Sequence, residues 1–366
     1  MRYLMINSVC GIGSTGRICT DLATQLEAQG NEVKIAYGRG SVPEQYQKYA
    51  VRIGNALGIK LHALKTRLFD ATGFGSRRET KIFLRWVKEY DPDVICLHNL
   101  HGYYINIELL FAYLKTCGKK VIWTLHDCWS FTGHCSYFSM AYCEQWKSRC
   151  WHCRQTRCYP KCIFQGNVYR NFERKRAAFT GVPNMTLITP SKWLANLVKQ
   201  SFLKEYPVEV VYNKIDTDVF KPTPSDFRER YGLQDKKIVL GVASSWDDRK
   251  GFDDFLKLSA MLDERYVVVL VGLKPKQMKK LPTNTVGITR TNSPRELAEI
   301  YTAADVFLNL TYEDTYPTTN LEAQACGTPC ITYRTGGSVE NVPKENIVEQ
   351  GNLREVIRKI NSCIQS

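Results

Sequence analysis

Acidic and hydroxyl side chains crowd the stretch from Tyr312 to Pro329, which follows an apolar run of strand length. Its loop carries Glu313 and Asp314, and Glu322 falls in the first turn of the helix expected next. Hydroxyl groups and free backbone amides at a helix start hold a phosphate, and a carboxylate beside them can accept hydrogen bonds from a ribose diol. Charge complementation of a helix N-terminus would also explain Glu322, but it leaves the crowded loop unexplained.

A basic turn, Asp247-Asp248-Arg249-Lys250-Gly251, lies between an expected strand and an expected helix. A lysine beside an arginine at a helix start can neutralise a diphosphate, because backbone N–H groups there have no partner within the helix. An exposed charged turn without a ligand is the alternative.

A glycine loop, Gly11-Ile12-Gly13-Ser14-Thr15-Gly16, fits the pattern G-x-G-x-x-G between a strand and a helix. Glycines there let the backbone approach a phosphate or a sugar closely. A dinucleotide site also needs an acid at the end of the second strand, where this chain has Arg39. Arg39 could bind a 2′-phosphate instead, so an NADP-dependent oxidoreductase remains an alternative, as does a tight turn with no ligand.

The elements that carry these loops predict an α/β fold. Apolar runs without alternation, separated by helices, indicate parallel strands buried on both faces. The expected strands are residues 2–7, 33–37, 94–97, 121–125, 237–243, 266–271, 305–308 and 329–332, and the expected helices are residues 16–29, 81–90, 251–262, 294–304 and 320–326, with an amphipathic basic stretch at 55–70. We expect two doubly wound domains, residues 1–212 and 213–366, joined through a linker at 213–224.

Composition excludes several classes of protein. The 366 residues are 44% hydrophobic and 23% charged, which excludes a disordered, collagen-like or coiled-coil chain. The sequence has no apolar run of 18 residues, so no transmembrane helix is predicted. The first residues lack a signal-peptide pattern, and we therefore expect a cytoplasmic protein.

The net charge of +14 is concentrated in two segments. Residues 51–90 hold nine basic and three acidic residues, and residues 146–176 hold nine basic residues and one acidic residue. Such clustering indicates an anionic partner, or else two well-solvated faces.

Six of the fourteen cysteines lie within residues 135–162 of a cysteine-rich insertion expected at about 128–165. The spacing C-x7-C-x6-C-x2-C of Cys135, Cys143, Cys150 and Cys153 fits a structural zinc site, and disulfides or unligated thiols are the alternatives. We expect this insertion to be too polar to form a hydrophobic core of its own, so that a metal ion or a disulfide would be needed to stabilise it. Basic charge and clustered cysteines also leave a nucleic-acid-binding protein as an alternative, although the sequence shows no known nucleic-acid-recognition motif.

The stretch from Tyr312 to Pro329 resembles the E-x7-E region of retaining GT-B glycosyltransferases of family 4, and Leu321-Glu322-Ala323-x-Ala325-Cys326-Gly327-Thr328-Pro329 matches its tail closely. Further family marks span residues 10 to 330. They are the glycine loop, Thr124-Leu125-His126-Asp127, Thr189-Pro190-Ser191, Asn213-Lys214-Ile215-Asp216, Phe220-Lys221-Pro222 and Arg249-Lys250-Gly251. The chain departs from the family in three places. The first acid of E-x7-E is Asp314 or has shifted to Glu313, Ser244 and Ser245 stand where the family has an arginine, and Lys214 stands where it has a glycine.

The resemblance implies a GT-B fold, two Rossmann-like domains facing across a cleft, with an N-terminal acceptor side and a C-terminal nucleotide-sugar side. It implies transfer of a sugar, with retention, from a UDP- or GDP-sugar to a glycan or lipid-linked glycan in polysaccharide biosynthesis. The implied catalytic residues are His126, Asp314 and Lys250. The implied donor-binding residues are Gly11, Gly13, Arg249, Lys250, Glu313, Thr318, Thr319, Asn320, Leu321 and Glu322.

The resemblance also bears on cofactors and partners. No metal is required for catalysis, because positive charge on the leaving diphosphate does most of the work and that phosphate can accept the acceptor's proton. The basic amphipathic residues 55–90 are expected to dock on an anionic membrane, at the inner face of the plasma membrane, where a lipid-linked acceptor lies. We expect no nucleic-acid partner.

Overall fold

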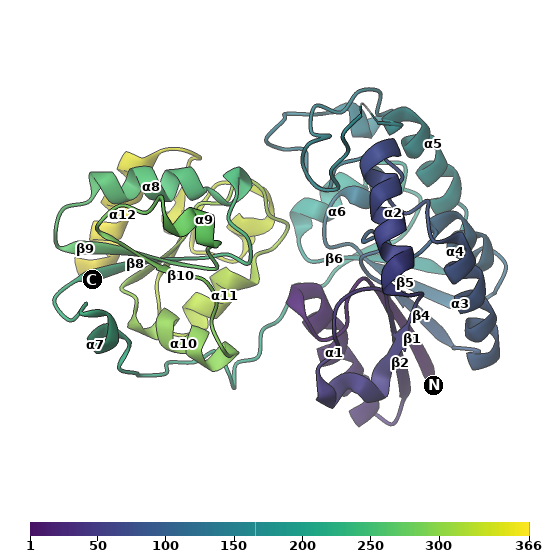
Figure 1. The fold of residues 1–366 in the computed structure, drawn as a ribbon, viewed down its shortest axis with the longest axis horizontal. Coiled ribbons are helices and arrows are strands. Elements are labelled where there is room, and N and C mark those ends of the chain that lie inside the picture. Colours follow the sequence, from purple (N-terminus) through teal and green to yellow (C-terminus); the bar gives the residue numbers. More distant parts are fainter. Residues whose placement is uncertain (165, 366) are drawn as a thin grey trace. The chain divides into compact units, whose positions relative to one another are not determined.

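The computed structural model describes residues 1–164 and 166–365 and divides into two compact units, Met1–Val211 and Tyr212–Ser366 (Figure 1). The predicted division fell after residue 212. Each unit holds one sheet in which every pairing is parallel. This is the α/β class that the unalternated apolar runs predict, and it is confirmed.

The sheet of the first unit has seven strands, and the chain winds outward from its first strand in both directions. In spatial order they are β3 (Ala50–Arg52), β2 (Glu32–Tyr37), β1 (Arg2–Asn7), β4 (Val94–Leu97), β5 (Lys120–Thr124), β6 (Met185–Thr189) and β7 (Val208–Val210). Consecutive side chains of β1 bury on opposite faces: Met5 joins one core cluster, whereas Leu4 and Ile6 join the other. Burial of both faces explains why these strands show no alternation.

Helices cover both faces of this sheet. They are α1 (Gly13–Ala28), α2 (Ala56–Phe69), α3 (Arg77–Tyr90), α4 (Ile107–Leu114), α5 (Val168–Phe179) and α6 (Lys192–Val198). Helix α1 buries Cys19 and Ala23 against the face that carries Met5, while α3 and α4 bury side chains such as Phe83 and Phe111 against the other. The carboxyl ends of the central strands therefore lie between two helical layers, where doubly wound folds bind ligands.

The second unit repeats this plan with six strands: β10 (Thr285–Ile288), β9 (Tyr266–Val271), β8 (Lys237–Val242), β11 (Val306–Asn309), β12 (Cys330–Tyr333) and β13 (Ile347–Val348). Its helices are α7 (Phe227–Tyr231), α8 (Phe252–Met261), α9 (Pro275–Met278), α10 (Pro294–Ala303), α11 (Thr318–Ala325) and α12 (Leu353–Gln365). Helices α8 and α12 pack on one face, and α7, α10 and α11 pack on the other. Strand order reverses between β8 and β11, so their carboxyl ends form the switch point of this sheet.

The cysteine-rich segment contributes side chains to the core of the first unit. Phe131, Phe138 and Trp146 are buried, with ring centroids 4.8–6.3 Å apart, and they belong to the same apolar cluster as the main sheet. Apolar aromatic burial stabilises the segment despite its many charges. The side chain of Lys175 is buried beside it and donates to the carbonyl oxygens of Trp129 and Thr132.

None of the described helices is long and apolar enough to cross a membrane.

Candidate functional site

The basic turn follows β8, at the carboxyl edge of the second sheet. A short 3-10 turn, Asp248–Lys250, is capped by the carboxylate of Asp247, which accepts from the Lys250 N–H at 3.1 Å. Gly251 follows with φ +70°, and a Cβ there would lie 2.1 Å from the carbonyl oxygen of Leu310. Only glycine permits this approach, which brings the turn against the loop after β11.

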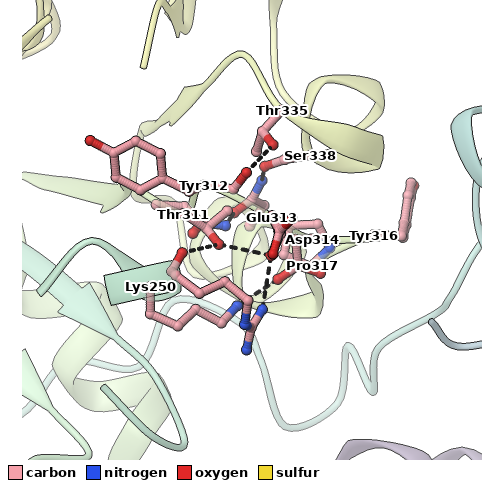
Figure 2. Close-up of polar contacts among 12 residues, drawn as sticks. Lys250, Thr311, Tyr312, Glu313, Asp314, Tyr316, Pro317, Thr335 and Ser338 are labelled. Atoms are coloured by element: carbon pink, nitrogen blue, oxygen red, sulfur yellow. Dashed lines mark hydrogen bonds and ion pairs between the residues drawn. The ribbon is translucent and has the colours of Figure 1, made fainter. Parts of the chain in front are cut away.

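Figure 2 shows where the two loops meet, with Lys250 reaching Asp314. The Lys250 Nζ lies 2.5 Å from Asp314 Oδ2, and Arg249 Nη1 donates to the carbonyl oxygen of Glu313 at 2.8 Å. The carbonyl oxygen of Arg249 accepts from the Tyr312 N–H at 2.8 Å. Main chain and side chains together therefore hold two cations beside the acidic loop.

The charge of Asp314 is set by these neighbours. Burial acts to raise the pKa of its carboxyl, but the ammonium of Lys250 and the guanidinium of Arg249 outweigh burial and hold the pKa below its usual value. The pair is mostly shielded from solvent, with side-chain exposures of 20% for Lys250 and 13% for Asp314. Asp314 is thus a carboxylate at neutral pH, and Lys250 is its cation.

Backbone and side-chain contacts from neighbouring segments hold the acidic loop in position. A Cβ on Gly336, whose φ is +47°, would lie 1.9 Å from the carbonyl oxygen of Asp314, and the Gly337 N–H donates to that oxygen at 3.1 Å. The hydroxyls of Tyr312 and Tyr333 both donate to Asp254 Oδ2 in the first turn of α8, at 2.7 and 2.8 Å. These contacts fix the position of Asp314 relative to the basic turn.

Helix α11 departs from the prediction in its start and in the use of its polar residues. It begins at Thr318, directly after Pro317, whose backbone is extended, and Thr318 and Thr319 lie half-buried in the first turn. Asn320 is fully buried, accepting from Asn309 and donating to Ser338 and Asn341. Its side chain is therefore fully hydrogen-bonded within the protein, so the prediction that Asn320 binds the donor now depends on its backbone; Leu321 is half-buried.

Glu322 lies in the second turn of α11, not the first. It is 5% exposed, and Oε2 accepts from the Tyr301 hydroxyl at 3.1 Å. A pattern of spacing places the residue on the helix but does not reveal that a tyrosine from α10 reaches it.

The glycine loop of the first unit has two kinds of glycine. Gly11 has φ +69°, and a Cβ there would lie 2.7 Å from the Tyr46 ring and 2.9 Å from Pro43. Gly13 has φ +65° with open space where a Cβ would stand. Close packing thus explains Gly11, whereas Gly13 leaves room beside the start of α1 for a ligand.

His126 follows β5 and pairs with a residue that the sequence analysis missed. His98 Nδ1 lies 3.0 Å from His126 Nε2, and the two rings stack with centroids 5.3 Å apart. Burial lowers the pKa of His98 to about 3 and that of His126 to about 4. Both imidazoles are therefore neutral at pH 7, so His126 can orient a sugar hydroxyl but is not a proton-loaded acid there. A polar residue directly after a buried strand is the signal that points to His98.

Three of the four cysteines named for the zinc site have recorded contacts. Cys135 and Cys153 share a hydrogen bond, and Cys150 Sγ accepts from the Gly133 N–H at 3.3 Å. Among residues 1–164 and 166–365, no group of three or more His, Cys, Asp or Glu side chains is placed so that it could hold a metal ion. The zinc prediction therefore gains no support from this arrangement.

Comparison with known proteins gives matches along nearly the whole chain. Residues 15–219 match the family described as Glycosyltransferase Family 4, and residues 225–366 match Glycosyl transferases group 1. The putative colanic acid biosynthesis glycosyl transferase WcaC of Escherichia coli strain K12 is 23% identical over 358 residues, which cover 94% of this chain and 86% of that protein. The alpha-galactosylglucosyldiacylglycerol synthase of Streptococcus pneumoniae is 24% identical over 193 residues, 48% of each chain.

Solved structures agree on the fold. Sucrose-phosphate synthase from Thermosynechococcus elongatus superposes with a TM-score of 0.73 at 16% identity, covering 100% of this chain and 90% of that one. Anabaena HepE, solved with UDP and glucose, gives a TM-score of 0.69 at 15% identity with the same coverage. These are glycosyltransferases of the GT-B fold, and neither the oxidoreductase nor the nucleic-acid-binding alternative is favoured.

Proposed function

The chain belongs to glycosyltransferase family 4 and is a glycosyltransferase, and we propose that it transfers a sugar from a nucleotide-diphosphate sugar, with retention of the anomeric configuration. One observation carries the proposal. Two cations, Arg249 and Lys250, are held beside the carboxylate of Asp314 at the switch point of the second sheet. A nucleoside diphosphate binds at such a strand edge, and its leaving oxygens need positive charge.

The donor half of the proposal assigns a role to each group. Lys250 and Arg249 contact the diphosphate, assisted by the first-turn N–H groups of α11 beside Thr318 and Thr319. Asp314 holds Lys250 in place before the donor binds and accepts a hydrogen bond from a sugar hydroxyl afterwards. Glu322 is buried in the second turn of α11, and its Oε2 already accepts a hydrogen bond from the Tyr301 hydroxyl. Its carboxylate therefore accepts from the ribose hydroxyls and from Tyr301 together.

The proton and charge balance needs no base from the protein. As the bond from the anomeric carbon to the phosphate oxygen breaks, the diphosphate leaves with the electron pair. The acceptor hydroxyl attacks from the same side and gives its proton to a leaving phosphate oxygen. His126, neutral at pH 7, orients a donor hydroxyl.

The same cations lead us to propose a reaction without a metal ion. Arg249 and Lys250 supply the charge that a divalent cation would otherwise supply to the diphosphate. We expect turnover to survive EDTA, and loss of turnover that Mg²⁺ or Mn²⁺ restores would contradict this part of the proposal.

The acceptor is proposed from the relatives and from the surface. WcaC is named for colanic acid biosynthesis and the pneumococcal relative for a glycolipid, so we propose a glycan or lipid-linked glycan acceptor and polysaccharide synthesis at the cytoplasmic face of an anionic membrane. Helix α2 supports membrane contact, because Leu57, Leu61 and Leu64 are 66%, 57% and 53% exposed. It carries three basic residues and no acidic residue.

Titration calorimetry with UDP, GDP, ADP and dTDP, followed by release assays with the matching sugar nucleotides, tests the proposal. We expect one nucleotide to bind clearly more tightly and its sugar to be released. Absence of binding for all four nucleotides would contradict a donor site in the second unit. Binding without release from any sugar donor in the presence of membrane lipid extract would contradict transfer.

A further inference from the structure

Arg39 lies at the carboxyl edge of the first sheet and has no ion-pair partner among the described residues. It lies two residues after the end of β2, and its backbone N–H donates to the carbonyl oxygen of Ser8. Within the described part of the chain, its Nε is buried without a hydrogen-bond partner and its guanidinium has no ion pair. A buried guanidinium nitrogen without an acceptor is satisfied when an anion binds beside it.

The loop after β4 closes around this guanidinium. Gly102 has φ +128°, and a Cβ there would lie 3.4 Å from Arg39 Nε, so the glycine leaves space for the arginine. Tyr103 follows with φ +70°, an unfavourable conformation for a residue with a side chain, and its ring lies 5.8 Å from the Arg39 guanidinium carbon. Strain of this kind concentrates at binding sites.

A chain of hydrogen bonds fixes the other wall. Asp127 Oδ2 lies 2.8 Å from His101 Nε2, and His101 Nδ1 lies 3.0 Å from the hydroxyl of Tyr159, which in turn bonds to Tyr103. Asp127 Oδ1 accepts from the Trp129 N–H, so the one carboxylate of this cluster is occupied on both oxygens and does not neutralise Arg39.

We propose that Arg39, Tyr103 and Tyr159 form a binding site for a phosphate group. The guanidinium presents a fork of N–H donors, and a phenol that turns its hydrogen away from its neighbour in the chain can donate to a further oxygen. A tetrahedral phosphate has enough oxygens for all three side chains, whereas a carboxylate has two. The assignment of this phosphate to the glycosyl acceptor rests on the proposed function, but phosphate binding itself does not.

The test uses the full chain with Lys250→Ala, so that the phosphate-binding turn of the second unit is disabled. Titration calorimetry measures binding of glucose 6-phosphate and of dihexanoyl phosphatidic acid below its micelle concentration. Saturable binding of either is expected, and the preferred compound distinguishes a soluble sugar phosphate from a lipid headgroup. Adding Arg39→Gln should weaken binding at least about tenfold, and Tyr159→Phe should weaken it severalfold.

The matched control is Arg52→Gln, an exposed arginine that ends the neighbouring strand β3. It should leave affinity unchanged, and thermal unfolding should show that Arg39→Gln folds normally. Equal affinity with and without Arg39→Gln would overturn the proposal, and so would binding of glucuronate in preference to both phosphates. Because the readout is binding in a donor-site variant, it remains decisive even if the proposed sugar transfer fails.

Discussion

Lys250 and Asp314 are each other's partners while the donor is absent. Their short contact keeps both side chains in one conformation, so little conformational entropy is lost when a diphosphate binds. A shielded ion pair is also sensitive, because removing one member leaves the other charge without compensation.

The first prediction concerns Lys250→Ala. We expect kcat/KM for the sugar donor to fall by about 100-fold or more, the usual loss when one charge stabiliser of a leaving group is removed. Steady-state nucleotide release measures this, and Lys279→Ala, an exposed lysine at the end of α9, is the control. A change below about threefold would mean that Lys250 does not contact the diphosphate.

The second prediction concerns protonation of His98 and His126. Burial lowers the pKa of His126 to about 4 and that of His98 to about 3. The neutral forms therefore dominate at pH 7, and each imidazole binds a proton only as the pH falls toward its own pKa. NMR of the imidazole C–H signals should show neither residue titrating between pH 5.5 and 8. A His126 midpoint near 6.5 would restore it as a candidate general acid.

At the scale of elements, the site depends on a backbone contact between two loops. Gly251 meets the carbonyl of Leu310, and this contact sets how far the basic turn stands from the acidic loop. A doubly wound sheet supplies the two strand ends, but the glycine determines their final approach.

The third prediction compares Gly251→Ala with Gly232→Ala. Both glycines have positive φ, +70° and +64°, but only a Cβ on Gly251 would meet another atom within 4 Å. Gly232→Ala should cost about 1 kcal/mol of unfolding free energy from backbone strain alone, and Gly251→Ala should cost more and also weaken nucleotide binding. Urea denaturation and calorimetry measure the two effects; equal costs and equal binding would show that the loop contact is unimportant.

The apolar face of α2 is a second feature at this scale. Sequence analysis predicted membrane docking for residues 55–90; within them α2 exposes an apolar face, whereas α3 buries Phe83 and Val87 in the core. Exposed Ile163 and Phe164 extend the face instead, because the Ile163 N–H donates to the carbonyl oxygen of Arg67 near the end of α2.

The fourth prediction follows from this face. Sedimentation with vesicles should show binding to phosphatidylglycerol over phosphatidylcholine, weakened by salt. The triple variant Leu57→Ser, Leu61→Ser and Leu64→Ser should lose about 3 kcal/mol of vesicle affinity, roughly 100-fold, if each leucine buries half its side chain. Ile82→Ser on α3, 49% exposed, is the control. Equal binding to both lipids, or by the triple variant, would contradict docking through α2.

For the whole molecule, the sequence predicted the strands of each sheet better than the contacts that their loops make. Unalternated apolar runs located the central strands, because burial on both faces selects them. Three-residue strands such as β3 and β7 carry too few residues for such a signal. The basic turn and acidic loop were recognisable from residue type, since both follow strands at one sheet edge.

Other parts of the site depend on tertiary contacts that no local pattern encodes. His98 lies 28 residues from His126, and Tyr159 lies 58 residues from His101. The polarity of the cysteine-rich segment gave no sign that its aromatic side chains join the main core, and the helical position of Asn320 gave no sign of its three amide and hydroxyl partners. Side chains at sheet edges are identified by residue type, but their partners depend on the folded chain.

Proton NMR of donor hydrolysis tests the central claim, that this chain cleaves a nucleotide-diphosphate sugar with retention. The α-linked UDP- or GDP-sugar selected by calorimetry is incubated with the full chain in D₂O, and the anomeric signals are followed before mutarotation proceeds. The account predicts release of nucleoside diphosphate with the α-anomer appearing first, and neither in Lys250→Ala. First appearance of the β-anomer would contradict retention, and an intact donor with every nucleotide would contradict the account as a whole.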